Sequence, residues 1–114
     1  MADSRKLTLG RKDIESILRR GSRTEKEALR LYWRASSDNS PSVFSLSIKS
    51  GVLKRAVDRN RWKRVVREAV RASGYQQTRG LVSVFVLIRV PTIELSLAAW
   101  KPIVQTLLHA AGAC

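Results

Sequence analysis

The sequence feature that most constrains the fold is a strongly cationic stretch at residues 49–71. It holds nine Lys or Arg residues and only two acidic ones, Asp58 and Glu68. On a helical wheel of about 100° per residue, residues 59–71 separate into an apolar arc and a cationic arc. This pattern predicts a helix with one buried face. The apolar members are Trp62, Val65, Val66, Ala69 and Val70.

Both ends of this helix are marked in the sequence. Asp58 places a negative charge at the cap or in the first turn, where the helix dipole favours it. Ser73 and Gly74 are typical of a helix end. The apolar arc then needs a second layer, such as a sheet, to pack against.

Periodicity predicts three elements before the cationic stretch. Residues 11–20 carry apolar side chains at helical spacing, and Gly21 is the expected stop. Residues 28–35 and 42–49 alternate apolar and polar side chains at period two, which predicts two strands. A turn-rich sequence at residues 36–41 separates them, so we expect the two strands to pair as a hairpin.

Two further elements are expected after it. Residues 81–90 are almost wholly apolar and β-branched, which predicts a central strand buried on both faces. A last helix lies within residues 96–111, with its regular part from about Lys101, because an interior Pro102 disfavours an earlier start. The expected fold is α+β, in the order α-β-β-(β)-α-β-α, where the bracketed strand is a short one before the cationic helix. Residues 1–114 form a single domain.

The overall charge points to a polyanionic partner. Lys and Arg number 22 against 9 Asp and Glu, for a formal net charge of +13, and 15 of the cations are Arg. Such an excess repels itself in a compact state, and Arg favours nucleic acid because it pairs phosphates and stacks on bases. A merely soluble basic surface and a membrane-surface helix are the alternatives. The membrane alternative is disfavoured because the apolar arc is needed for packing.

Several classes of protein are excluded. A single cysteine, Cys114, makes no internal disulfide, and with the single His109 it cannot supply a structural zinc site. The longest apolar run, residues 84–88, is too short for a membrane span. The polar start at residues 1–6 lacks the apolar stretch of a signal peptide, so we expect a cytoplasmic protein. No nucleophile, base or metal cluster is evident, so the protein alone is not expected to be catalytic.

Two polar residues are candidates for contacts with bases. Asn60 lies in the cationic arc and can bind a base edge or a 2′-hydroxyl, although a local hydrogen bond at the helix start is an equal alternative. Tyr32 lies between Arg30 and Arg34 on the polar face of its strand. That setting suits stacking on an unpaired base, and the alternative is an exposed strand tyrosine with good β-propensity.

Residues 54–68, Lys-Arg-Ala-Val-Asp-Arg-Asn-Arg-Trp-Lys-Arg-Val-Val-Arg-Glu, resemble the signature of the bacterial ribonuclease P protein component. That family carries an Arg-Asn-Arg-x-Lys-Arg-x-x-Arg-Glu core, usually preceded by Ala-Val. Every fixed position of the core is met by residues 59–68. The remaining expected elements agree in outline over nearly the whole chain.

The resemblance implies an accessory subunit of a ribonucleoprotein enzyme. In the family, the protein binds a large catalytic RNA, and the holoenzyme removes the 5′ leader from precursor tRNA. The RNA performs the hydrolysis with Mg²⁺ held by the RNA and the substrate. The resemblance also implies a two-layer α/β sandwich with a left-handed β-α-β crossover. We expect a monomer on its own, with the catalytic RNA and precursor tRNA as partners and neither DNA nor a membrane.

The resemblance also assigns residues. The motif helix of the family faces the RNA subunit, and basic neighbours extend that surface. The RNA-subunit candidates are Lys54, Arg55, Arg59, Asn60, Arg61, Lys63, Arg64, Arg67 and Arg71. The family has a cleft between its first helix and the sheet that receives the single-stranded leader, and the candidates there are Tyr32, Phe44, Ser47, Lys49 and Arg89. Aromatic residues that family members often carry on the first helix are replaced here by Ile14 and Leu18.

Two rival functions stay open. A ribosomal or RNA-chaperone protein would bind structured RNA with similar charge but with no dependence on a leader. A DNA-binding regulator would read the major groove with the cationic helix, and a dimer with regular half-site spacing would then be expected.

Overall fold

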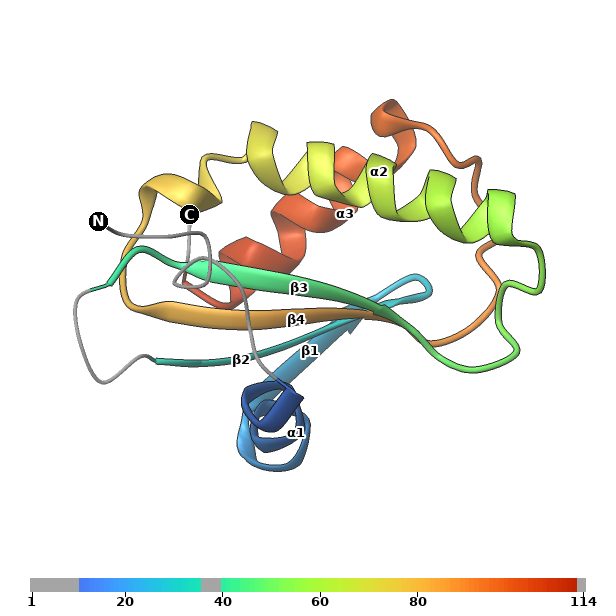
Figure 1. The fold of residues 1–114 in the computed structure, drawn as a ribbon. Helices are drawn as coiled ribbons and strands as arrows, with labels where there is room; N and C mark the ends of the chain where they lie inside the picture. The colour runs from blue at the N-terminus through green and yellow to red at the C-terminus, as the bar shows by residue number, and fades with distance from the viewer. Residues whose placement is uncertain (1–10, 36–39, 113–114) are drawn as a thin grey trace, which may run out of the picture.

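A computed structural model describes residues 11–35 and 40–112 of the chain. It has three α-helices, one short 3-10 helix and a four-stranded mixed sheet, in the order α-β-β-β-α-β-α (Figure 1). The elements are α1 (Arg11–Arg20), β1 (Ser22–Lys26), β2 (Leu29–Ala35), β3 (Val43–Ile48), α2 (Ala56–Ala72), η2 (Tyr75–Gln77), β4 (Leu81–Leu87) and α3 (Leu97–Ala110).

The sheet has the strand order β1-β2-β4-β3. β2 pairs with β1 and β4 in antiparallel fashion, whereas β3 pairs with β4 in parallel. The predicted hairpin between β2 and β3 is therefore wrong, because β4 lies between them. The apolar character of β4 explains the difference, since a strand covered on both faces takes the central place and separates the two alternating strands.

The additional short strand lies elsewhere than predicted. It is β1, directly after α1, and residues 49–55 before the cationic helix form a loop instead. β1 has the sequence Ser-Arg-Thr-Glu-Lys and is exposed at four of its five positions. A polar edge strand carries no hydrophobic alternation, so its sequence gives no period-two signal.

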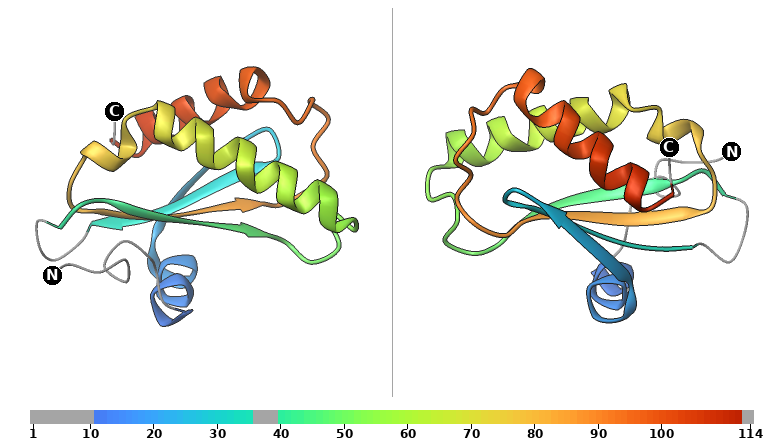
Figure 2. Two further views of the ribbon diagram at one scale, coloured as in Figure 1. Left: turned by 45° about the horizontal axis from the view of Figure 1, so that its top comes forward. Right: turned by 180° about the vertical axis from the view of Figure 1, so that it is seen from behind.

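Helices cover both faces of the sheet. α2 and α3 pack together over one face and form the two-layer body of the fold, and α1 lies against the opposite face (Figures 1 and 2). The core lies between α2, α3 and the sheet, where the rings of Trp62 and Trp100 meet edge to face with centroids 6.3 Å apart. The hand of the β3-α2-β4 crossover follows from the order of the two parallel strands (Figures 1 and 2). When the sheet is viewed from the α2 side and turned so that β3 runs upward, β4 lies to the left of β3, so the crossover is left-handed. Such connections are usually right-handed.

Gly21 ends α1, for a reason that differs from the usual left-handed stop. Its amide donates to the carbonyl of Ile17 at 2.8 Å, and a Cβ built on it would lie 2.6 Å from that oxygen and 2.8 Å from the carbonyl oxygen of Trp33. Glycine is required because the end of α1 approaches the backbone of β2 closely.

The last helix begins earlier than predicted. α3 starts at Leu97, with Pro102 inside it, and the Ser96 hydroxyl accepts a hydrogen bond from the Ala99 amide at 3.3 Å. Pro102 removes the bond to the carbonyl four residues earlier, that of Ala98, which lies in the exposed first turn. A solvent-facing carbonyl is satisfied by water, so the proline is tolerated there.

Part of the prediction lies outside the described residues. This holds for the polar start at residues 1–6, for most of the turn at residues 36–41 and for Cys114. Within the described ranges, no helix combines the length and the apolar character that a membrane span requires.

Candidate nucleic-acid interface

The first candidate surface is the outward face of α2. Its inward face buries Trp62, Val66, Ala69 and Val70 against the core. Seven of the nine predicted RNA-subunit residues are exposed on or just before this helix, and Lys63 is half-buried at its side. The exposed ones are Lys54, Arg55, Asn60, Arg61, Arg64, Arg67 and Arg71.

Arg59 differs from the other members of the motif. Its guanidinium is half-buried, and Nη1 donates to the carbonyl oxygens of Leu53 at 2.9 Å and Lys54 at 2.8 Å. These carbonyls belong to the loop that enters α2. Arg59 therefore fastens this loop to the first turn of the helix in addition to any contact with RNA.

The outward face of α2 is poorly neutralised. Arg64, Arg67 and Arg71 are three and four residues apart, so their like charges lie next to one another. Glu68 approaches Arg71 at 3.5 Å, but both side chains are about half-exposed, and such surface pairs stabilise by only about 0–1 kcal/mol. A row of phosphates placed along this face would reverse the repulsion and release counterions.

The second candidate surface is a groove on the opposite face of the sheet, beside α1. It has a volume of about 540 Å³ and is lined by α1, β2, β3, β4 and the residues that follow β4. Four of the five predicted leader residues lie in it together: Tyr32, Ser47, Lys49 and Arg89. The groove therefore combines an aromatic ring, a hydroxyl and cations, which are the groups that bind single-stranded nucleic acid.

Phe44 does not lie with the other four. Its ring packs edge to face against Tyr75 and Phe85, with centroid distances of 5.8 and 6.1 Å, on the core side of the sheet. Phe44 and Ser47 are three positions apart on β3, and side chains an odd number of positions apart point to opposite faces. The assignment of Phe44 to the cleft is therefore wrong.

The groove also contains residues that were not among the predicted leader contacts, although Leu18 was expected at a position where family members often carry an aromatic residue. They are Leu18 from α1, Arg30 from β2, and Val86 and Ile88 from the β4 segment. Arg30 lies opposite Val86 in the pairing of β2 with β4. Arg30 is two positions from Tyr32 on β2, so both side chains point to the groove side of the sheet. That alternation was visible in the sequence. The pairing of β2 with β4, which brings Val86 beside Arg30, was not.

A hydrogen-bonded network borders the groove. The Glu25 carboxylate on β1 accepts from Nε and Nη2 of Arg30 at 2.9 and 2.8 Å and from Nη2 of Arg89 at 3.3 Å. Nη1 of Arg30 donates to the Tyr32 hydroxyl at 3.0 Å. The hydrogen bonds from Arg30, and then the one from Arg89, lower the pKa of Glu25 below its usual value.

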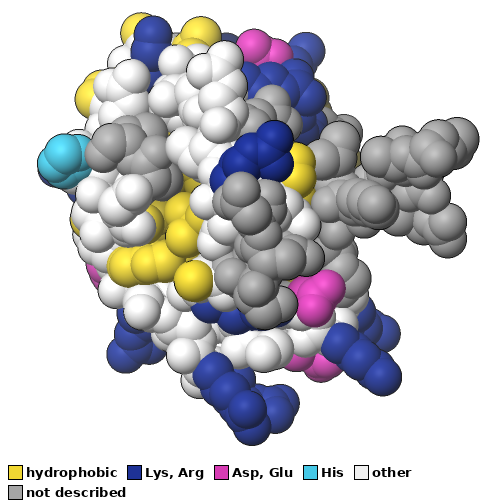
Figure 3. All heavy atoms as spheres, turned by 90° about the vertical axis from the view of Figure 1, so that its left-hand side faces the viewer, with side chains coloured by type: hydrophobic (Ala, Val, Ile, Leu, Met, Phe, Trp, Pro, Cys, Tyr) yellow, Lys and Arg dark blue, Asp and Glu magenta, His cyan; other side chains and the backbone are white. Residues whose placement is uncertain are grey.

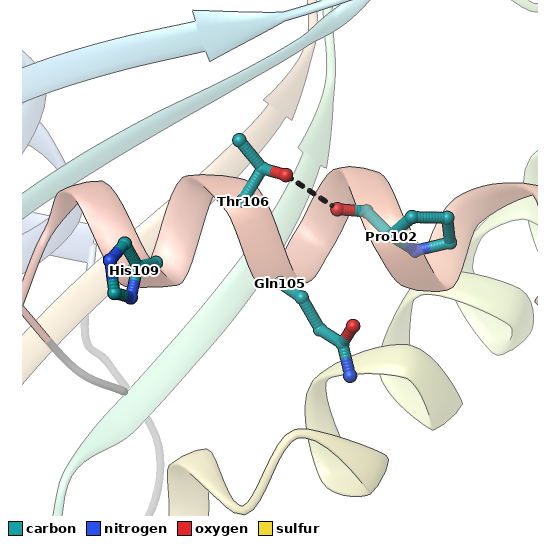
Figure 4. A pocket seen from close by; sticks show the side chains of 4 residues that line it. All are labelled: Pro102, Gln105, Thr106 and His109. Carbon is teal, nitrogen blue, oxygen red and sulfur yellow. Dashed lines mark hydrogen bonds between the residues drawn. The ribbon is translucent and has the colours of Figure 1, made fainter.

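A third hollow, of about 430 Å³, lies on α3 and is lined by Pro102, Gln105, Thr106 and His109 (Figure 4). Thr106 donates to the carbonyl of Pro102 at 2.9 Å. Thr106 is the one hydroxyl in this lining beside the His109 imidazole, and its proton is donated to the Pro102 carbonyl rather than held for a base. Over residues 11–35 and 40–112, no three His, Cys, Asp or Glu side chains form a metal-binding group.

Cationic side chains therefore lie on two sides of the molecule. An end view shows Lys and Arg at the upper edge, toward α2, and at the lower edge, toward α1, with an apolar patch between them (Figure 3). The two surfaces are separated by the sheet, so one extended polyanion or two different ones can contact both.

Comparisons with known proteins agree with this geometry. A family model described as Ribonuclease P matches residues 1–112. No curated protein shows significant similarity to the chain. Among solved structures, the RNase P protein from Staphylococcus aureus is 16% identical with a TM-score of 0.77, covering 93% of this chain and 94% of that one. The RNase P protein from Thermotoga maritima is 21% identical with a TM-score of 0.69, covering 88% and 92%.

The two solved structures share the fold of this chain over most of its length. The family match spans nearly the whole sequence, including the motif on α2. The chain therefore belongs to the ribonuclease P protein family, the protein part of a ribonucleoprotein endonuclease.

Proposed function

We propose that this chain is the protein subunit of ribonuclease P, with α2 bound to the catalytic RNA and the groove beside α1 bound to the 5′ leader of precursor tRNA. The observation that carries the proposal is the presence of two different surfaces on opposite sides of the sheet. One is an exposed cationic helix face, and the other is a groove with an aromatic ring between cations. The family membership supports both assignments.

The α2 surface acts through charge. Arg61, Arg64 and Arg67 project from a helix whose other side is anchored in the core, so their positions are held by the fold. Neutralising phosphates with these cations reduces the repulsion between the catalytic RNA and the precursor tRNA. Less free Mg²⁺ is then needed to bring the two RNAs together.

The groove acts on unpaired nucleotides. Tyr32 offers a half-buried ring for stacking, Ser47 offers a hydroxyl, and Lys49 offers an exposed cation for a phosphate. A mature tRNA lacks the leader and cannot occupy the groove. The protein thereby favours substrate over product, whereas the bond cleavage belongs to the RNA subunit and its Mg²⁺.

The testing experiment is cleavage of precursor tRNA at low Mg²⁺ by a matched ribonuclease P RNA, with and without the protein. We expect protein-dependent cleavage and no cleavage by the protein alone. Tight RNA binding without any stimulation would instead favour the ribosomal or RNA-chaperone alternative.

The groove assignment has its own test. Tyr32→Ala should reduce the preference of the holoenzyme for precursor over mature tRNA, because one stacked base contributes about 1–3 kcal/mol. Gln105→Ala, an exposed change on α3, is the matched control and should leave the preference unchanged. An undiminished preference in Tyr32→Ala would contradict leader binding in this groove.

A further inference from the structure

Glu25 connects three of the side chains that surround the groove. It belongs to the edge strand β1, and its two oxygens accept hydrogen bonds from Arg30 and Arg89, which both line the groove. Arg30 in turn donates to the Tyr32 hydroxyl, and its guanidinium carbon lies 5.9 Å from the centroid of the Tyr32 ring. A single carboxylate thus holds the groups that would contact a nucleic acid.

The donors of Arg30 are occupied in a specific way. Nε and Nη2, one of the pairs with which arginine grips a phosphate, both point to Oε1 of Glu25. The remaining nitrogen, Nη1, donates to Tyr32. Three of the five N–H donors of Arg30 are therefore used, and the Nε and Nη2 pair that supports the carboxylate contact is not available to a phosphate.

Arg89 is held in a similar way by two acceptors from the β1–β2 hairpin. Nη2 donates to Glu25, and Nη1 donates to the backbone carbonyl of Glu27. Glu27 has a φ of 56°, a left-handed conformation that is unfavourable for a residue with a side chain. The hairpin keeps this conformation while its carbonyl accepts from Arg89.

We propose that Glu25 is a positioning residue that makes the groove select an unpaired base over a phosphate. It withholds Arg30 and Arg89 from the nucleic-acid backbone and fixes the Tyr32 ring for stacking. Lys49, across the groove, is then the cation left to meet a phosphate. This inference rests on the proposed function, since the base belongs to the leader.

The test measures binding of precursor tRNA by the reconstituted holoenzyme as a function of salt. Three substrates are compared: precursor with a normal leader, precursor with abasic leader nucleotides, and mature tRNA. The variants are Glu25→Ala and Glu25→Gln, which keeps an oxygen acceptor but removes the charge. Glu94→Gln removes the same charge from an exposed position outside the groove and is the matched control.

We expect Glu25→Ala to lower the preference for a normal over an abasic leader at least about fivefold, the lower end for one stacked base. A plot of the logarithm of its binding constant for precursor tRNA against the logarithm of the salt concentration should also become steeper. We expect the slope to change by about 0.7 for each arginine that gains a phosphate contact. Glu25→Gln should also lower the preference for a normal leader and steepen the salt slope. Glu94→Gln should change neither the preference nor the slope. Simple loosening of the fold would weaken binding without steepening the slope.

Three results would overturn the proposal. Unchanged base preference and slope in both Glu25 variants would remove the role of the carboxylate while leaving leader binding intact. Lost base preference with an unchanged slope would show that the arginines are not withheld from phosphate. Equal binding of precursor and mature tRNA by the unmodified holoenzyme would refute leader binding itself, and this inference with it.

Discussion

Replacing Arg59 by alanine separates two tasks within the cationic motif. Arg59 donates two hydrogen bonds to the loop before α2, at 2.9 and 2.8 Å, whereas Arg64 is exposed on the outward face. A net hydrogen bond contributes about 0.5–1.5 kcal/mol, so the loss of two partly exposed bonds should cost about 1–2 kcal/mol. Arg64→Ala at an exposed helical position should change stability by no more than about 0.5 kcal/mol.

The magnitude translates into a measurable shift. With about 2.1 cal/mol/K of unfolding entropy per residue, a chain of 114 residues loses about 4 °C in Tm per kcal/mol. Thermal unfolding followed by circular dichroism should therefore show Arg59→Ala lower by about 4–8 °C and Arg64→Ala nearly unchanged.

A salt titration of RNA-subunit binding completes the comparison. Arg64→Ala should flatten the log–log slope by about 0.7–0.9, the effect of one lost phosphate contact. Arg61→Ala should do the same. Arg19→Ala, an exposed change on α1 across the sheet, is the matched control. Equal Tm values for the Arg59 and Arg64 variants would refute the structural role of Arg59, and an unchanged slope in Arg64→Ala would refute its phosphate contact.

Three further predictions concern the buried Tyr75, which follows α2, and the close approach of α1 to β2. Tyr75→Phe removes a buried hydroxyl that lies 2.8 Å from both Val43 O and Ser83 Oγ, and urea unfolding should show a loss of about 2 kcal/mol. A double variant with Ser83→Ala should lose less than the sum of the single changes, and strict additivity would contradict the coupling. Burial raises the pKa of Tyr75 from 10.0 to about 12, so its stabilisation is complete below about pH 10 and is lost as pH rises toward 12. The shift of two pKa units corresponds to a loss of about 2.7 kcal/mol in the free energy of unfolding at high pH. If the free energy of unfolding of Tyr75→Phe fell equally between pH 10 and 12, Tyr75 would not be its cause. Gly21→Ala places a methyl group against two backbone carbonyls and should cost about 1–3 kcal/mol, so an unchanged Tm would refute the close approach.

The main elements were predictable because each carries a local signal. The helix at residues 11–20 was predicted with its observed bounds, and β2, β3 and β4 lie within their predicted ranges. Strand β1 was missed because an exposed edge strand needs no apolar residues. The groove was predicted only in part, since its lining depends on which strands are neighbours.

The sequence alone determined the identity of the cationic helix and the family to which the chain belongs. An amphipathic arc and a run of charged residues are local properties of the chain, so they can be recognised without knowledge of the fold. Tertiary structure decided which polar residues meet. Glu25, Arg30 and Arg89 come from three different segments, and only the pairing of β1, β2 and β4 brings them together. The parallel pairing of β3 with β4 places Phe44 beside Phe85 on the core side, while Tyr32 on β2 lies in the groove. Strand neighbours are chosen by non-local burial, which no short window of sequence contains.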